Sequence, residues 1–252
     1  MSTYVFKDKQ RKIKFYAKDA TNENRDIRFY CPNIDCDAHM YICGVDGLSA
    51  AYFSANHQNY PHVKGCPFGS SNKFKSNEHD ENAFDFENTL EALMTPSQST
   101  VKKETPSTHK TGDPTKKPLR TIRQVYDMCK SFDPADTYSG VKIGQMIVDD
   151  RSEYMYPKGV FHKRLIEGQA KNYFYDSKRK EITILAPIKS KKYSFILKFA
   201  DRKLFSYVQK SIYNNRDKII VVAGEWKSVG AGKFNSFYTD LTGKGQVTVI
   251  KK

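Results

Sequence analysis

Four residues near the N-terminus have the types and the spacing of a metal site. Cys31 and Cys36 form a C-x4-C pair, and His62 and Cys66 form an H-x3-C pair 25 residues further along the chain. Zn²⁺ is held in structural sites by four Cys or His ligands at tetrahedral positions, and two close pairs on tight turns can supply two ligands each. Pro32 and the Gly65–Pro67 stretch provide turn residues. We therefore predict a Zn²⁺ site made of these four side chains.

Other residues could replace one of the four ligands. Cys43 lies in an apolar stretch, where a buried free thiol is the alternative interpretation. His57 precedes His62 by five positions and could take its place. His39 follows the first pair closely and is a candidate for the outer shell, whereas His79 lies in an acidic stretch.

A site filled by four protein ligands leaves no position open for water. Such a metal stabilises a fold and does not activate a nucleophile, because its binding free energy becomes folding free energy. The cysteine content agrees with this interpretation: five cysteines in 252 residues are too few and too unevenly placed for a disulfide framework. We expect the metal to stabilise a region of few aliphatic residues.

Residues 28–68 resemble the zinc-binding N-terminal module of competence protein CoiA-like proteins. The resemblance is carried by the Cys-Pro pair, by the Tyr52-Phe53-Ser54-Ala55 strand and by the closing His-x3-Cys pair. It implies that Cys31, Cys36, His62 and Cys66 are the ligands. The sequence departs from the pattern in having four residues, and not two, between the first cysteines, and it has no recognisable downstream nuclease motif. The resemblance therefore implies a zinc module without catalysis.

The charge is divided unevenly along the chain, whose formal net charge is +14. Residues 121–252 hold 25 Lys and Arg against 13 Asp and Glu, whereas residues 1–94 are slightly acidic. Residues 95–120 contain four prolines and nine Ser or Thr, and such a segment cannot bury enough apolar surface to offset its ordering entropy. We predict a zinc-binding domain at 1–94, a flexible linker at 95–118, and a helix with a basic domain at 119–252.

The absence of long apolar segments argues against a membrane protein. The longest aliphatic run, 219–223, is far shorter than the roughly 20 residues that cross a bilayer. The N-terminus shows no secretory signal peptide. We expect a cytoplasmic protein with no membrane partner.

The basic half has the pattern of a small barrel. Leu119, Ile122, Val125, Tyr126 and Cys129 lie at helical spacing, and the sequence beyond them is rich in strands. Tyr193, Phe195, Leu197 and Phe199 alternate with other residues and predict a strand with one buried face. Residues 204–212 have the apolar spacing of a helix of three turns. The expected order is strand, hairpin at 176–180, strand, strand, helix, strand, strand.

This order resembles the OB-fold over about residues 160–252, with Gly168 where a long first strand would bend. The resemblance implies a Greek-key barrel that binds oligonucleotides; another small β-barrel or an α+β sandwich is the alternative. The fold class we predict is mixed α+β and mainly β, with a small zinc-binding N-terminal domain, a linker, and an OB-like barrel with one helix between its third and fourth strands.

Lysines beside aromatic residues suggest how the basic half could bind single strands. Ammonium groups contact phosphates while ring faces stack on bases, each stack contributing about 1–3 kcal/mol. The strand that begins at Tyr193 is expected to be core, and Trp226 fits the core and the stacking interpretation equally. The predicted nucleic-acid-binding residues are Lys171, Tyr173, Tyr175, Lys189, Lys191, Lys192, Trp226, Lys227, Tyr238 and Lys244.

The sequence shows no motif of a known catalytic class. Residues 230–234 lack the spacing of a phosphate-binding loop, and no nucleophile elbow or zinc-protease motif is present. We therefore predict a non-catalytic protein that binds single-stranded DNA, or alternatively RNA, in an accessory role on DNA, for example on a mobile element. Its N-terminal domain would contact a protein partner or the DNA. The alternatives are a protein-interaction adaptor and a metal-dependent nuclease that uses Asp149, Asp150 and Glu153.

Overall fold

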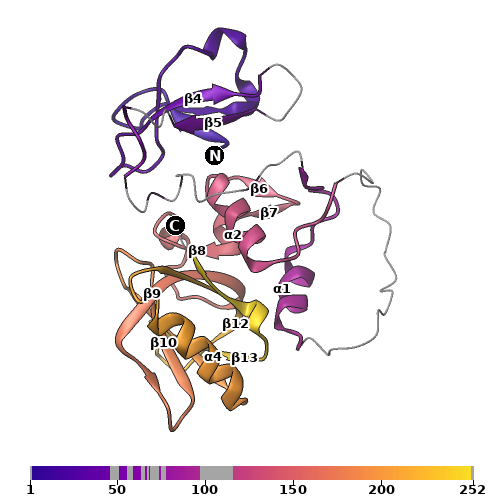
Figure 1. Ribbon diagram of the computed structural model, residues 1–252, viewed down its shortest axis with the longest axis vertical. Helices are drawn as coiled ribbons and strands as arrows, with labels where there is room; N and C mark the ends of the chain where they lie inside the picture. Colours follow the sequence, from indigo (N-terminus) through magenta and orange to yellow (C-terminus); the bar gives the residue numbers. More distant parts are fainter. Residues whose placement is uncertain are drawn as a thin grey trace.

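The computed structural model of the chain has a small antiparallel sheet, a helical middle region and a β-barrel (Figure 1). It describes residues 2–45, 51–55, 59–63, 66, 68, 74, 78–96 and 116–250. The chain is therefore a mixed α+β protein, mainly β, as expected. No helix in the described ranges is long and apolar enough to span a bilayer.

The N-terminal sheet is built from short strands around a core of aromatic rings. Its order is β2-β1-β3-β4-β5, with the strands β1 (Tyr4–Phe6), β2 (Lys14–Tyr16), β3 (Phe29–Tyr30), β4 (His39–Cys43) and β5 (Tyr52–Ala55). The buried rings of Phe29 and Phe53 lie 5.2 Å apart, and Phe15 stacks on Phe29 at the same distance. Ser2 and Phe53 exchange two backbone hydrogen bonds, which bring the chain start to β5.

The second half forms a closed five-stranded barrel. Its strands are β9 (His162–Asp176), β10 (Glu181–Ala186), β11 (Tyr193–Phe199), β12 (Ile219–Ser228) and β13 (Ser236–Leu241). The order is β9-β10-β11-β13-β12, and β12 pairs with β9 to close the barrel. β11 and β13 run parallel, and the other pairs of the barrel are antiparallel. The edge strands β8 (Ile147–Val148) and β14 (Val247–Ile250) extend the sheet beside β9 and β12.

The alternation that predicted a half-buried strand is confirmed. Tyr193, Phe195, Leu197 and Phe199 of β11 are buried in the barrel core. The expected helix is α4 (Arg202–Tyr213), which begins at the N-cap Asp201 and lies between β11 and β12 in the chain. Its apolar face carries Leu204, Phe205, Val208 and Ile212, and it belongs to the same core. One face of α4 therefore packs against the barrel.

Gly168 marks the point at which β9 changes its partner. Residues 162–168 pair with β12, whereas residues from Gln169 onward pair with β10. A side chain at Gly168 would begin 2.6 Å from the carbonyl oxygen of Leu185. Only glycine permits that close approach of two backbones, which agrees with the expected bend.

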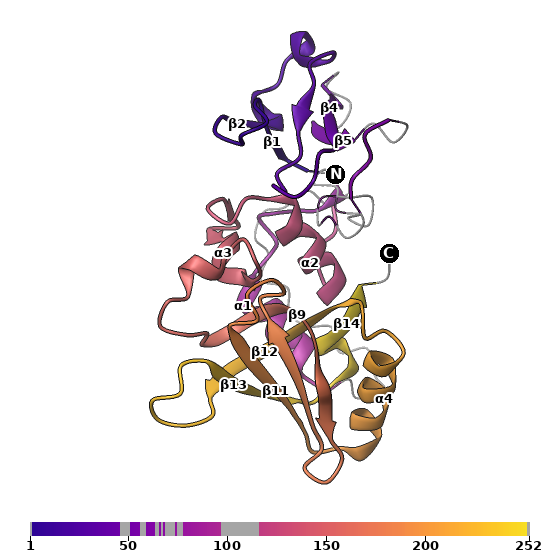
Figure 2. The same cartoon turned by 90° about the vertical axis from the view of Figure 1, so that its left-hand side faces the viewer.

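Three further helices cover the barrel on the side of the N-terminal sheet (Figure 2). They are α1 (Phe86–Met94), α2 (Ile122–Ser131) and α3 (Ile143–Met146), and the short strands β6 (Thr137–Tyr138) and β7 (Val141–Lys142) lie between α2 and α3. The predicted amphipathic helix is α2, which begins with a capping box between Thr121 and Gln124. Leu90 of α1 and Val125 of α2 share a core with Leu165 and Val221 of the barrel.

Contacts also join the N-terminal sheet to the region after the linker. The backbone N–H of Thr3 donates to the carbonyl of Ser131, and the ammonium of Lys14 lies 2.7 Å from Asp133. The division at residues 94 and 118 stays a prediction, although α1 of the expected first domain packs on the barrel. Most of the expected linker, residues 97–115, lies outside the described residues.

Candidate functional site

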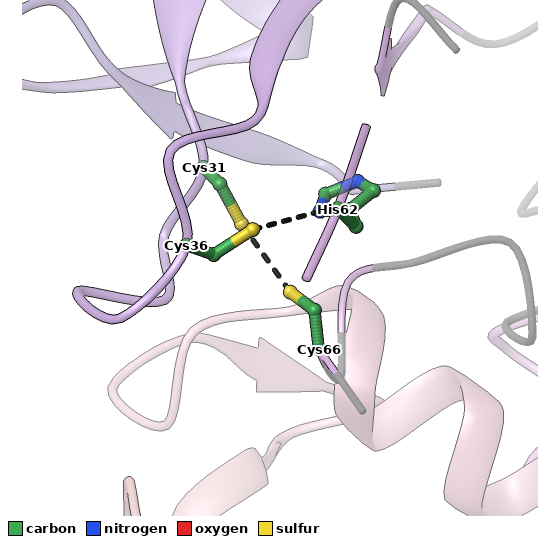
Figure 3. A group of neighbouring side chains, drawn as sticks. All are labelled: Cys31, Cys36, His62 and Cys66. Carbon is green, nitrogen blue, oxygen red and sulfur yellow. Dashed lines mark hydrogen bonds between the residues drawn. The ribbon is translucent and has the colours of Figure 1, made fainter. Parts of the chain in front are cut away.

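The four predicted metal ligands meet at one point (Figure 3). Cys31 follows β3 directly, and a turn closed by the hydrogen bond from the N–H of Cys36 to the carbonyl of Asn33 brings the second thiol back. A similar bond from Cys66 to Val63 turns the second pair inward. All four ligand atoms lie within 4.8 Å of one another. The predicted grouping is therefore confirmed, and these residues could hold a metal ion.

The distances suit tetrahedral coordination. The sulfurs of Cys31 and Cys66 are 3.5 Å apart, and the sulfur of Cys36 is 3.4 Å from Nδ1 of His62. Tetrahedral Zn–S bonds of about 2.3 Å would place two sulfurs about 3.8 Å apart. The cysteines are free thiols and not a disulfide, and their spacing is compatible with ligands around a common centre.

Arg11 holds the first pair of ligands in place. Its guanidinium donates to the carbonyls of Cys31 at 3.2 Å, Asn33 at 3.3 Å and Cys36 at 2.8 Å. The residue has a left-handed backbone, with φ of 54°. Sequence reasoning missed this residue because the hairpin that carries it is remote from the cysteine motif in the sequence.

The four groups strongly influence each other's protonation. Burial, together with the hydrogen bonds of Cys36 and Cys66, raises the pKa of the Cys31 thiol well above its usual value. Hydrogen bonds from the Cys31 and Cys66 thiols lower the pKa of Cys36. Burial would lower the pKa of His62, but its hydrogen bonds and charge interactions with Cys36 and Cys66 outweigh this effect and raise the pKa to about 9. A bound cation would replace these shared protons.

The alternative ligands lie away from the group or outside the described chain. Cys43 is partly exposed and contacts the carbonyl of Tyr41, and it does not join the group. The ring of His39 stacks on Tyr60 at 3.6 Å, and His79 contacts the carbonyl of Lys117. His57 lies outside the described residues.

The acidic residues of the nuclease alternative are engaged in structural contacts. Asp149 is fully buried, and it accepts hydrogen bonds from Lys130 at 2.7 Å and from Nε of Arg151 at 2.9 Å. Burial favours the protonated carboxyl, but the charges of Arg151 and Lys130 hold the pKa of Asp149 well below its usual value. Asp150 accepts a hydrogen bond from the backbone N–H of Lys189. These carboxylates form no metal-binding group in the described part of the chain.

A bulge in β9 carries the most exposed of the predicted stacking residues. Tyr175 pairs with Ile182 and Ala170 with Ile184, so β9 has extra residues between these two pairs. Within the bulge, Phe174 turns into the core, whereas Tyr173 has φ of 53° and is 97% exposed. Bulges of this kind re-aim side chains next to functional sites. Tyr175 and Lys171 beside it are also exposed.

The prediction that Trp226 stacks on bases is wrong. It is only 1% exposed, its ring lies 4.8 Å from Phe195, and its Nε1 donates to the carbonyl of Arg164. Side chains alternate along β12, so the indole points into the barrel whereas its neighbour Lys227 points outward. The indole is therefore part of the core.

The other predicted contacts differ in their surroundings. Lys189 forms an ion pair with Asp35 in the turn between the first two metal ligands, and Lys192 lies 3.8 Å from Glu153. The ring of Tyr238 faces outward on β13, beneath the ammonium of Lys198 at 3.8 Å. Lys191, Lys227 and Lys244 are exposed.

Phe234 is one of the exposed aromatic residues that the sequence did not single out. Phe234 is 59% exposed in the loop between β12 and β13, next to the exposed Lys233. Sequence reasoning interprets this loop only as a hairpin. An aromatic residue among the glycines of a polar loop was the signal that could have identified it.

Comparison of the chain with protein-family models, curated proteins and solved structures finds no match. The resemblances to the zinc module and to the OB-fold therefore stay predictions. Support for a function comes from the geometry of the metal group and of the barrel.

Proposed function

We propose that the chain binds single-stranded DNA through its barrel, without catalysis and without base-specific recognition. RNA is the alternative ligand of the same chemistry. The main support is the connection of the barrel: strands one to five are β9 to β13, in the order one-two-three-five-four, with α4 between the third and fourth strands. This is the arrangement of the OB-fold, which binds oligonucleotides over strands two and three and with the loops that join strands one to two and four to five.

Exposed rings and cations lie in, or directly before, both of those loops. The hairpin between β9 and β10 is preceded by Tyr173 and Tyr175 and contains Lys178 and Arg179, which are exposed. The loop between β12 and β13 holds Lys233 and Phe234. Cations that contact phosphates and rings that stack on bases bind single strands with little sequence preference. The net positive charge of residues 121–252 favours the same ligand.

A titration with labelled oligothymidine at increasing salt tests this function. We expect measurable binding that weakens steeply, because each phosphate contact contributes about 0.7 to the slope of log affinity against log salt. Tyr173→Ala should weaken binding about 5- to 150-fold, the equivalent of roughly 1–3 kcal/mol for one stack. Tyr154→Ala is the matched control, since Tyr154 is 70% exposed but lies beside Glu153, outside the barrel strands.

Three outcomes have different meanings. Absence of binding, or binding that salt does not weaken, would refute the function. Equal losses of affinity in Tyr173→Ala and Tyr154→Ala would show that the bulge is not part of the binding site. An oligouridine competitor measured in parallel ranks RNA against DNA.

We further propose that the metal is Zn²⁺ and that its role is structural. Three thiols and one imidazole suit Zn²⁺, and no ligand position is left for a reacting water. Metal analysis of the purified protein should give one zinc per chain, and Cys66→Ser should lower that content. Cys43→Ser is the matched control, because its thiol lies outside the group, and an equal loss in both variants would contradict the assignment.

One observation favours a protein partner at the metal module as a second function. Ile34 is 70% exposed between the first two ligands, and Val63 is 43% exposed between the second two. Both apolar side chains stand on the turns between ligands of the metal group, where an apolar segment of another protein could contact them. Ile34→Ser with Val63→Ser should abolish capture of such a partner while leaving oligonucleotide binding unchanged. A change in oligonucleotide binding would instead assign these side chains to the nucleic-acid site.

A further inference from the structure

The outer face of α4 carries a basic and aromatic stripe that the expected site does not include. Lys203, Tyr207 and Lys210 follow each other at positions i, i+4 and i+7, so they share one side of the helix. All three are exposed, and Tyr207 is 54% exposed. The opposite side of α4 is buried in the barrel core, and in Figure 2 the helix lies on the flank of the barrel. The stripe therefore faces solvent on a rigid support.

A second element extends the stripe. The exposed Lys244 begins a short helical turn at residues 244–246, and its ammonium lies 4.4 Å from the centre of the Tyr207 ring. Two segments far apart in the sequence thus bring one ammonium group onto the exposed Tyr207 ring, and Lys203 and Lys210 lie on the same side of the helix. In the described part of the chain, Lys203, Lys210 and Lys244 form no ion pair with an acidic side chain. Their charges remain available to an anionic ligand.

The acidic residues at the two ends of the helix are already engaged. Asp201 caps the helix and accepts the N–H of Lys203, and Asp217 lies 2.9 Å from the ammonium of Lys218. They therefore do not neutralise the middle of the stripe.

Both ends of α4 lie close to the segment formed by β9 and the β9–β10 hairpin. The ammonium of Lys180 donates to the carbonyl of Ala200, next to the start of α4. At the other end, the guanidinium of Arg216 lies over the rings of Tyr213 and Phe174, at 4.5 Å and 5.3 Å. Phe174 is the buried neighbour of Tyr173 in the bulge. The C-terminal end of α4 therefore lies close to the bulge that carries Tyr173.

We infer that the outer face of α4, together with Lys244, is a second contact segment for the single strand. The strand would leave the β9–β10 hairpin and continue along the helix. Its phosphates would pair with Lys203, Lys210 and Lys244, and a base would stack on Tyr207. This inference rests on the proposed function. It adds a binding segment for the nucleic acid outside the β-strands β10 and β11 of the barrel. From Lys203 to Lys210 the helix rises about 10 Å, which is enough for more than one nucleotide.

Oligothymidines of two lengths test the inference with the full chain. We compare about 6 nucleotides, which a hairpin-centred site can hold, with about 20 nucleotides, which exceed the usual site of one such barrel. The test variant is Lys203→Gln with Lys210→Gln. The control variant is Lys9→Gln with Lys142→Gln, which removes the same charge from exposed positions in the β1–β2 hairpin and in β7.

We expect the test variant to lose affinity for the long oligonucleotide only. Its salt slope should fall by about 1.4, since two phosphate contacts of a single strand are lost. The control variant should match the wild type at both lengths, and Tyr207→Ala should reproduce the length-dependent loss with an unchanged slope.

The failures can be told apart. If the wild type binds neither oligonucleotide, the proposed function itself fails. If the wild type binds and the test variant keeps its affinity and slope, the helix segment is refuted and the function stands. Equal losses at both lengths would also refute a second segment. Polyglutamate at equal charge concentration is the competitor that tests for binding of any polyanion. If it displaces the long oligonucleotide from the wild type but not from the test variant, the helix binds polyanions in general and the inference is refuted.

Discussion

Lys130 should contribute more to stability than any exposed lysine of this chain. Its ammonium lies 2.7 Å from Asp149 and 2.9 Å from Glu167, and its side chain is 2% exposed. Arg151 also pairs with Asp149, so the cluster has two cations and two carboxylates. In Lys130→Met, Arg151 would still neutralise Asp149, whereas Glu167 would remain buried and unpaired.

The expected cost follows from that unpaired carboxylate. Removing one partner of a buried ion pair costs about 3–5 kcal/mol, whereas an exposed pair contributes about 0.2–1 kcal/mol. Lys14→Met is the matched control, because the Lys14 side chain is 30% exposed and pairs with Asp133. We expect the first variant to lose at least three times as much free energy of unfolding as the second.

Urea unfolding followed by tryptophan fluorescence measures this difference. The single tryptophan, Trp226, is buried in the barrel beside Phe195, and its emission reports whether the barrel is folded. With a slope of about 1–3 kcal/mol/M, a cost of about 3–5 kcal/mol should lower the midpoint of Lys130→Met by roughly 1–5 M.

Adding Glu167→Gln to Lys130→Met should recover part of the loss, since the unpaired charge is removed. The reasoning would be refuted if Lys130→Met cost no more than Lys14→Met. It would also be refuted if the added Glu167→Gln made Lys130→Met less stable still.

Two further predictions concern single contacts. Gly168→Ala should destabilise the barrel by about 1–3 kcal/mol, because its new methyl group would meet a backbone carbonyl at 2.6 Å; Gly230→Ala, where nothing lies within 4 Å, is the control in the same urea assay, and equal effects would contradict the close-approach argument. Arg11→Gln should weaken metal binding about 10- to 100-fold, since it releases the carbonyls that position the first ligand pair. Competition with a chelator measures this loss, and an equal loss in the neighbouring Lys12→Gln would show that charge, and not positioning, is responsible.

Features that depend on neighbours in the sequence could be predicted from it. The two ligand pairs are local, since short turns bring Cys31 to Cys36 and His62 to Cys66, and a metal group needs no more than two such pairs in contact. The buried face of β11 and the apolar face of α4 follow from periods of two and 3.6 residues, because those periods are properties of the backbone. The bend expected at Gly168 also depends on a local property, the absence of a side chain, and it coincides with the point at which β9 changes its partner.

Features that depend on distant segments were decided by the tertiary structure. The sequence left Trp226 equally suited to the core and to stacking, and the tertiary structure decided that it is buried beside Phe195. Asp149 was a candidate metal ligand until packing placed it against Lys130. Tyr173 is exposed because pairing with β10 forces a bulge into β9. In each case burial and charge are set by contacts between residues far apart in the chain, and those contacts leave no periodic pattern in the sequence.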